Sequence, residues 1–284
     1  MNLKHEDTRL FVKLAATFVA IQALTLLLSP SLATPVSVLT AFLLLAALLF
    51  HFRRLADADR ERHARRVQAV AELTRLLPLR RPMPPMQGWS ASPELATTLL
   101  SVILDHRPTT VVELGSGVSS IVVGYALELA GRGEAVSFDH NADFLEATRH
   151  ELVRHGIKSV TLSHAPLGTI TLNGHAAPWY ELDDSALPGT IDLLVIDGPP
   201  RMVGRDSRYP ALPMLRDRLS PQAVVVVDDA LRAEEAAMIR QWARPTDGWS
   251  WSVEHVPSKK GIAVLRRLGA PVPDNPMAPA TMTS

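Results

Sequence analysis

Acidic and histidine side chains stand where apolar runs of this sequence end. These residues are Glu113, Asp139, His164, Asp197, Asp228 and Asp229, and the runs begin near residues 111, 135, 159, 191 and 223. Short apolar runs bounded by polar residues are typical of buried strands in a parallel sheet. Because ligands bind outside the carboxyl ends of such strands, we expect these side chains to converge on one edge of the sheet.

Two glycines one residue apart follow the first apolar run. Gly115 and Gly117 allow a tight turn in which the backbone approaches a ligand closely, and a helical pattern begins near Val118. The pattern departs from a dinucleotide fingerprint, since Ser120 stands at the third glycine position. Asp139 lies 22 residues after Gly117, about where a ribose-binding carboxylate falls in a βαβ unit. This spacing favours a nucleoside ligand that is not mainly phosphate.

These motifs resemble those of the class I S-adenosylmethionine-dependent methyltransferases over roughly residues 89–267. The matching segments are 113–117, Asp139, 196–200 and 227–230. The resemblance implies that S-adenosylmethionine is the cofactor, with its methionine part at the glycine turn, its ribose at Asp139 and its adenine near Ala165. The cofactor-binding residues it implies are Glu113, Gly115, Ser116, Gly117, Asp139, His140, Ala165 and Asp197.

The same resemblance implies a fold. We expect an α/β, Rossmann-like, doubly wound sheet of seven strands. Its last two strands are predicted at 251–256 and 261–266, where two alternating runs flank a short turn and indicate an antiparallel β-hairpin. A helix is predicted at 93–104, with Ser92 as its N-cap and Pro93 at its first position.

Within the family, the chain looks most similar to the catechol-type small-molecule O-methyltransferases. That branch holds Mg²⁺ with carboxylates after the fourth and fifth strands, so the resemblance implies a metal site at Asp197, Asp228 and Asp229 and a hydroxyl group as the methyl acceptor. The lysine expected three residues after Asp197 is replaced by Pro200. An alternative is that Asp228 and Asp229 cap a helix beginning near Leu231. The candidate catalytic residues are Asp197, Asp228 and His164, with His175 and Asp229 as further candidates for the general base.

The N-terminal part has a different character. Two apolar runs predict helices at about 10–29 and 36–52, joined by a short turn with two prolines, and together they suggest a transmembrane hairpin over 1–52. Arginines crowd the segment after residue 52, so the positive-inside rule places both ends in the cytoplasm. We therefore expect a multi-pass protein of the inner (cytoplasmic) membrane that contacts lipid through this hairpin. The alternative is a signal peptide cleaved near Ala33, which would leave 36–52 as a single anchor.

The remaining segments follow in order. Residues 53–78 predict a juxtamembrane amphipathic helix that lies on lipid, pairs with a second copy in a homodimer, packs on the catalytic domain or stays solvated. The methyltransferase domain is expected at 79–270 and a disordered tail at 271–284. Loops at 174–180 and 201–210 are expected to face the acceptor, with Trp89 as a candidate lid residue.

Composition excludes several functions. The 29 basic and 29 acidic residues balance, which gives no global attraction to nucleic acid. The absence of cysteine excludes disulfides and thiolate chemistry.

Taken together, the motifs and the apolar segments predict a membrane-anchored methyltransferase that acts on an oxygen of a small-molecule, lipid or glycan acceptor. Two alternatives stay open: an aminopropyl transferase on the same fold, and a non-catalytic membrane scaffold with a nucleoside pocket.

Overall fold

The computed structural model describes residues 3–28, 31, 33–172, 174–245 and 249–268. The predicted tail at 271–284 lies outside them. The chain divides into two compact units, residues 1–65 and 66–284. Each unit is described by itself below.

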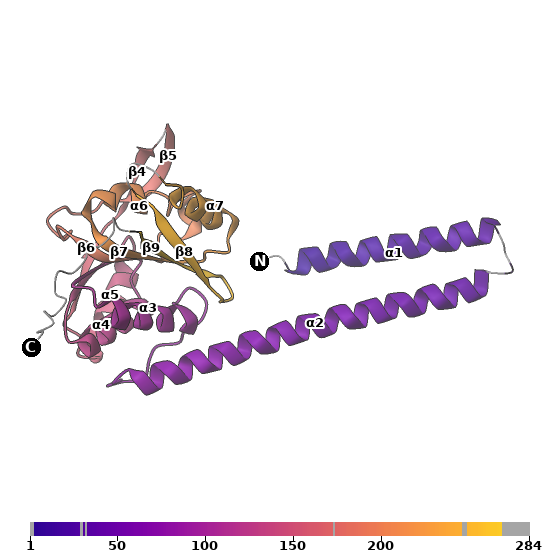
Figure 1. The fold of residues 1–284 in the computed structure, drawn as a ribbon, viewed down its shortest axis with the longest axis horizontal. Helices are drawn as coiled ribbons and strands as arrows, with labels where there is room; N and C mark the ends of the chain where they lie inside the picture. Colours follow the sequence, from indigo (N-terminus) through magenta and orange to yellow (C-terminus); the bar gives the residue numbers. More distant parts are fainter. Residues whose placement is uncertain (1–2, 29–30, 32, 173, 246–248, 269–284) are drawn as a thin grey trace, which may run out of the picture. The chain divides into compact units, whose positions relative to one another are not determined.

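Two antiparallel helices make up the first unit (Figure 1). α1 spans Leu3–Leu28, and α2 spans Ala33–Leu76 and continues into the second unit. Gln22 joins them, since its Nε2 donates to Thr40 Oγ1 at 2.9 Å and its Oε1 accepts from Ser37 Oγ. The large apolar side chains between Val38 and Phe52 point outward and are mostly exposed.

Among the described residues, one helix is long and apolar enough to cross a membrane, whereas the sequence predicts two. This helix is Thr34–Leu76, whose most apolar stretch has a mean hydropathy of 2.1 and no buried residue. Within the described side chains, α1 has a shorter apolar stretch, Ala15–Leu27, and the side chains of residues 3–11 and 14 lie outside this description.

α2 is also continuous where the sequence analysis divides it after residue 52. Its 44 residues run from the apolar segment through the arginine-rich one without a break. No glycine or proline occurs between residues 36 and 77, so no residue there interrupts the backbone hydrogen bonds. Pro35 lies in the first turn, where its missing N–H costs nothing.

The second unit contains the seven-stranded sheet, and the predicted doubly wound fold is confirmed. Its strands are β1 (Thr110–Leu114), β2 (Glu134–Asp139), β3 (Val160–His164), β6 (Ile191–Ile196), β7 (Leu219–Asp228), β8 (Trp251–Val256) and β9 (Ile262–Arg267). The strand order is β3-β2-β1-β6-β7-β9-β8. The first five strands run parallel, while β9 is antiparallel to both β7 and β8. Strand order reverses between β1 and β6, which is where ligands bind in such sheets.

Helices cover both faces of this sheet (Figure 1). α3 (Pro93–His106), α4 (Val118–Ala130) and α5 (Ala142–Arg154) pack on one face, whereas α6 (Ala211–Leu215) and α7 (Ala233–Trp242) pack on the other. Two 3₁₀ turns lie at Arg201–Val203 and Arg216–Arg218. As predicted, Ser92 caps α3, accepting a hydrogen bond from the Leu95 backbone N–H at 3.1 Å.

A second, two-stranded sheet was not predicted. β4 (Leu167–Leu172) and β5 (His175–Tyr180) pair antiparallel and project beyond the main sheet (Figure 1). The loop predicted at 174–180 is therefore mostly strand β5, although Gly174 and Pro178 are residue types that strand interiors disfavour. The hairpin places Tyr180 at its end, next to the carboxyl edge of the main sheet.

Candidate active site

The glycine turn after β1 is held in place by the acid that ends β2. The backbone N–H and the hydroxyl of Ser116 both donate to Asp139 Oδ2 at 2.9 Å. Gly115 has a φ of 98°, and a Cβ there would lie 2.8 Å from the backbone nitrogen of Gly198. The turn therefore needs glycine at 115 for both its conformation and its close approach to the segment after β6.

Glu113 lies beneath this turn and does not line the pocket above it. Its side chain is fully buried, and its Oε2 accepts a hydrogen bond of 2.5 Å from Ser120, whose hydroxyl oxygen in turn accepts from Gly117 N–H at 3.1 Å. Burial raises the pKa of Glu113, which Ser120 partly offsets. Glu113 Oε1 is a buried oxygen without a partner among the described residues. Glu113 thus supports the start of α4 rather than facing the pocket.

A pocket opens at the carboxyl ends of the central strands. It is lined by Trp89, Gly115, Ser116, Asp139, His140, Phe144, Tyr180, Asp197, Gly198, Pro200, Arg208, Asp229, Arg232 and Lys260. Of the residues expected to bind cofactor, Gly115, Ser116, Asp139, His140 and Asp197 are in this lining. Glu113, Gly117 and Ala165 are not. The glycine turn, the acid at the end of β2 and an aromatic wall suit a nucleoside with a polar extension.

His164 and Ala165 follow β3, at the edge of the sheet. The Ala165 backbone N–H donates to the Asp139 carbonyl oxygen at 2.8 Å, and its side chain is buried. The exposed His164 ring has its Nε2 3.2 Å from the His140 carbonyl oxygen. His164 does not line the pocket, because β3 is separated from the ligand-binding switch point by β2 and β1. The side chain of His175 lies outside the described residues.

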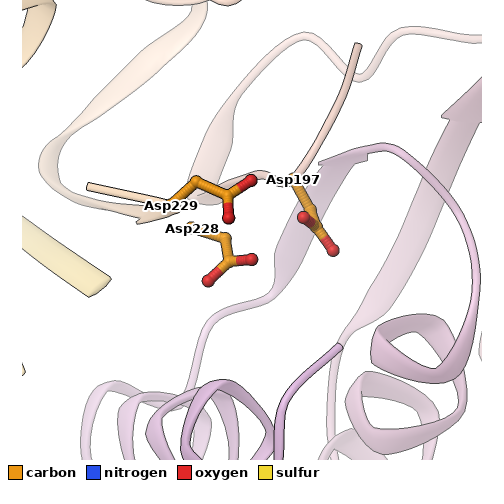
Figure 2. Close-up of side chains that lie close together, drawn as sticks. All are labelled: Asp197, Asp228 and Asp229. Carbon is orange, nitrogen blue, oxygen red and sulfur yellow. The ribbon is translucent and has the colours of Figure 1, made fainter. Parts of the chain in front are cut away.

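The three aspartates after β6 and β7 meet as predicted (Figure 2). One carboxylate oxygen from each of Asp197, Asp228 and Asp229 lies within 4.8 Å of the others. Burial raises the pKa of Asp228 well above its usual range, and the other two carboxylates add to this effect. Burial also raises the pKa of Asp197, although the charge of Arg208 opposes it.

Arg208 enters this cluster from the loop after β6. Its Nη2 lies 3.1 Å from Asp229 Oδ2 and 3.7 Å from Asp197 Oδ1. The guanidinium also donates to the carbonyl oxygens of Asp197, Asp228 (2.9 Å) and Pro199 (3.3 Å). Burial lowers the pKa of Arg208, but the surrounding carboxylates outweigh this and raise it above its ordinary value. The sequence predicts only that this arginine lies in a loop facing the acceptor, and the contact with the aspartates was not expected.

Asp229 is also bound by two further cations. Arg232 Nη1 lies 2.7 Å from its Oδ2, and Lys260 Nζ lies 3.4 Å from its Oδ1. The N-cap of α7 is Arg232 and makes no side-chain cap hydrogen bond. The alternative in which Asp228 and Asp229 cap the following helix is therefore wrong, since α7 begins at Ala233, further along the chain.

The three aspartates do not fit a divalent metal as they are arranged here. Mg²⁺ needs a nearly octahedral set of oxygens at about 2.0–2.1 Å and usually keeps several waters. The Asp229 carboxylate is already shared among Arg208, Arg232 and Lys260. A metal bound to the same oxygens would lie against the Arg208 guanidinium and would be repelled by its charge.

Tyr180 is a site residue that the sequence did not single out. Its hydroxyl group lines the pocket and is buried, but it has no hydrogen-bond partner among the described residues. Burial raises the pKa of Tyr180 well above its ordinary value, and Asp139 adds to this, so the hydroxyl stays protonated and can donate. Leaving such a group unpaired costs about 1–3 kcal/mol, which suits a donor that pairs with a ligand.

The strand order and the site define a Rossmann-like transferase fold with a nucleoside pocket. Residues 112–230 match the family described as "Methyltransferase domain". This segment is a methyltransferase domain, and the methyltransferase prediction is confirmed. No curated protein matches it.

Several solved structures are similar to the chain. The methyltransferase PaMTH1 of Podospora anserina, bound to S-adenosylhomocysteine, is 15% identical, with 63% of this chain and 80% of that chain covered and a TM-score of 0.48. The O-methyltransferase TomG of Streptomyces achromogenes, in complex with S-adenosylmethionine, is 16% identical, with 64% and 82% covered and a TM-score of 0.48. An O-methyltransferase of Bacillus cereus, in complex with S-adenosylhomocysteine, is 12% identical, with 65% and 84% covered and a TM-score of 0.47.

Proposed function

We propose that this methyltransferase acts on an oxygen atom of an amphiphilic acceptor at the cytoplasmic surface of the membrane. The observation that carries the proposal is the rim of the pocket. Trp89 and Phe144 line the pocket, yet 74% and 62% of their surfaces are exposed. Met202 and Leu231 are similarly exposed. Met202 lies two residues after Pro200, and Leu231 lies one residue before Arg232. Pro200 and Arg232 both line the pocket. A charged pocket with an apolar rim suits an acceptor with a polar head and an apolar body.

The N-terminal unit supports a location at the membrane. The apolar part of α2 is long enough to span a bilayer and buries none of its most apolar residues. An exposed apolar surface of this kind is stable in lipid, whereas in water it would aggregate. The arginines that follow it favour a cytoplasmic position for the catalytic domain.

The pocket residues divide into two groups by what they would contact. Asp139 and the Gly115–Ser116 turn suit the ribose and methionine parts of S-adenosylmethionine, which when bound supplies an electrophilic methyl group. Tyr180 lines the pocket together with Asp139 and Asp197 and would donate a hydrogen bond to a ligand oxygen. Most of the rate enhancement would come from holding the acceptor oxygen in line with the methyl group.

Asp197 is the candidate general base. It lines the pocket, and burial raises its pKa, which makes its carboxylate a better proton acceptor than an exposed one. Asp228 and His164 do not line the pocket. Asp197 would take up the proton that the acceptor hydroxyl loses when it is methylated.

A labelling experiment tests the proposal. Full-length protein in detergent micelles would be incubated with S-adenosylmethionine that carries a radiolabelled methyl group, together with the lipid extract or the aqueous extract of a strain lacking the gene. We expect label in a lipid-phase product, and we expect Asp139→Ala to reduce it about tenfold or more at subsaturating cofactor by weakening cofactor binding. The exposed Asp143→Ala is the matched control, since Asp143 does not line the pocket. Label found only in water-soluble products would contradict the proposed acceptor class.

A further inference from the structure

The Arg208 guanidinium lies against two of the three carboxylates that the family resemblance assigns to a metal, those of Asp197 and Asp229. We propose that the Arg208 guanidinium takes the place of a divalent cation there, so that this transferase works without a metal. The proposal rests on the proposed function for the role of the site. It goes beyond that function in naming the cation that the site uses.

The contacts of Arg208 are those of a built-in cation. Its guanidinium reaches two carboxylates, those of Asp197 and Asp229, and three backbone carbonyl oxygens of the segments that carry them. Arginine has five N–H donors in a planar fork and is charged at every physiological pH. Arg208 can therefore bind backbone carbonyl groups at the ends of β6 and β7 as well as carboxylates. A single metal ion held only by the carboxylates would not bind those carbonyl groups.

The charge balance of the cluster points the same way. Three carboxylates lie together at Asp197, Asp228 and Asp229. Arg208 supplies one positive charge beside Asp197 and Asp229, and Arg232 and Lys260 supply two more at Asp229. Glu235 lies 3.6 Å from Arg232 and adds a fourth carboxylate, so three cationic side chains already offset all but one of the four negative charges. A divalent ion added to this set would leave an excess of positive charge in a buried place, which is unfavourable.

Arg208 also reaches the pocket. It is in the lining together with Asp197, and its side chain is almost completely buried. Arg208 lies next to the candidate base, Asp197. We infer that it keeps this base close to the acceptor oxygen, as a metal ion does in related reactions. Arg208 acts here by positioning Asp197, whose backbone and side chain it contacts.

Manganese binding distinguishes a site that uses Arg208 as its cation from a site that binds a divalent metal ion. The paramagnetic resonance signal of free Mn²⁺ would be measured with the full-length protein in detergent micelles. Wild type is expected to leave Mn²⁺ free. Arg208→Met, which removes the charge and keeps the volume, is expected to bind one Mn²⁺, and this binding should disappear when Asp228→Asn is added. Arg205→Met is the matched control from the same loop and should behave as wild type.

Activity and cofactor binding complete the test. Methyl transfer by wild type should be unchanged in excess chelator, and transfer by Arg208→Met should be partly restored by added guanidinium ion. If wild type binds one Mn²⁺ and loses it in Asp228→Asn, or if folded Arg208→Met binds none, the proposal is wrong. Should Arg208→Met not fold, the wild-type measurement and Arg208→Lys decide, because lysine keeps the charge and should still exclude Mn²⁺. Calorimetry measures binding of S-adenosylmethionine to the wild type independently. If the wild type does not bind S-adenosylmethionine, the proposed function is wrong, but the manganese result is unaffected.

Discussion

Two buried tyrosines differ in what their hydroxyl groups contact. The Tyr125 hydroxyl accepts a hydrogen bond from Arg80 N–H at 2.9 Å and lies 3.0 Å from His155 Nδ1. The Tyr180 hydroxyl has no such partner among the described residues. Because an unpaired buried polar group destabilises the folded state, the two residues should respond oppositely to removal of the hydroxyl.

We expect Tyr180→Phe to leave the unfolding midpoint of the unliganded protein unchanged or raised, while it weakens binding of S-adenosylmethionine or of the acceptor. Tyr125→Phe is the matched comparison and should lower the free energy of unfolding by about 1–3 kcal/mol. Thermal unfolding with and without S-adenosylmethionine measures both effects. If Tyr180→Phe destabilises the unliganded protein as much as Tyr125→Phe does, the hydroxyl has a structural partner and is not reserved for a ligand.

His155 should make the stability of the protein depend on pH. Its ring is fully buried, and this burial lowers its pKa below 6.5. Below pH 6.5 the unfolded chain therefore binds a proton that the folded chain does not, so stability falls as pH decreases from 6.5 towards the folded pKa. The slope can reach about 1.4 kcal/mol per pH unit.

The measurement is the unfolding midpoint of wild type and His155→Phe over this pH range. Wild type should lose stability on acidification, and the difference between the two proteins should shrink, because the variant has no imidazole to protonate. The exposed His150→Asn should keep the wild-type slope. Parallel pH profiles for wild type and His155→Phe would show that other groups cause the dependence.

At the scale of elements, the end of α2 belongs to the catalytic domain. Ala69, Leu73 and Leu77 recur every four residues, face one side of the helix and are buried, with Leu73 and Leu77 in the core that covers α3 and α4. This settles one of the roles left open for the amphipathic helix, since its last turns pack on the domain. The catalytic unit therefore begins near Arg66, before the boundary at residue 79 that the sequence suggests.

We expect a fragment that starts at Arg66 to fold and one that starts at Pro78 to be unstable or aggregated. In the full chain, Leu73→Ala should cost about 2–5 kcal/mol, as is usual for a buried leucine. Leu76→Ala is the control, because Leu73 is 3% exposed and Leu76 is 42% exposed in the same turn of helix. Chemical unfolding of both variants gives the comparison, and equal stabilities would mean that α2 does not contribute to the core.

At the scale of the whole molecule, the chain combines a soluble type of fold with an apolar hairpin. We expect the full-length protein to sediment with membranes and to resist carbonate extraction, since the exposed apolar surface of the hairpin favours lipid. The fragment that starts at Arg66 is the control and should stay in the soluble fraction. A reporter fused after Ser284 should be active only on the cytoplasmic side. Full-length protein in the soluble fraction would refute the anchor.

The sequence by itself determined the features that depend on neighbouring residues. The buried parallel strands appear as apolar runs because both of their faces are covered, so the segments that end at Glu113, Asp139 and Asp197 were located to within a residue or two. Gly115 marked the turn because only glycine adopts its φ of 98° easily. The resemblance then supplied the doubly wound fold, and the carboxyl ends of its parallel strands place the acids on one edge.

Only the tertiary structure decided which charges meet and which groups stay unpaired. Arg208 is separated by 11 and 20 residues from Asp197 and Asp228, and no local pattern indicates that it enters their cluster instead of facing solvent. Tyr180 reaches the pocket through a hairpin that is hard to recognise in the sequence because Gly174 and Pro178 are unusual in strands. Leu73 packs in a core with α3 and α4, which begin 20 and 45 residues after it. These contacts depend on how the loops and helices close over the sheet. Such long-range packing is absent from the periodicity of any single segment, and here it determines whether the acidic cluster holds a metal or an arginine.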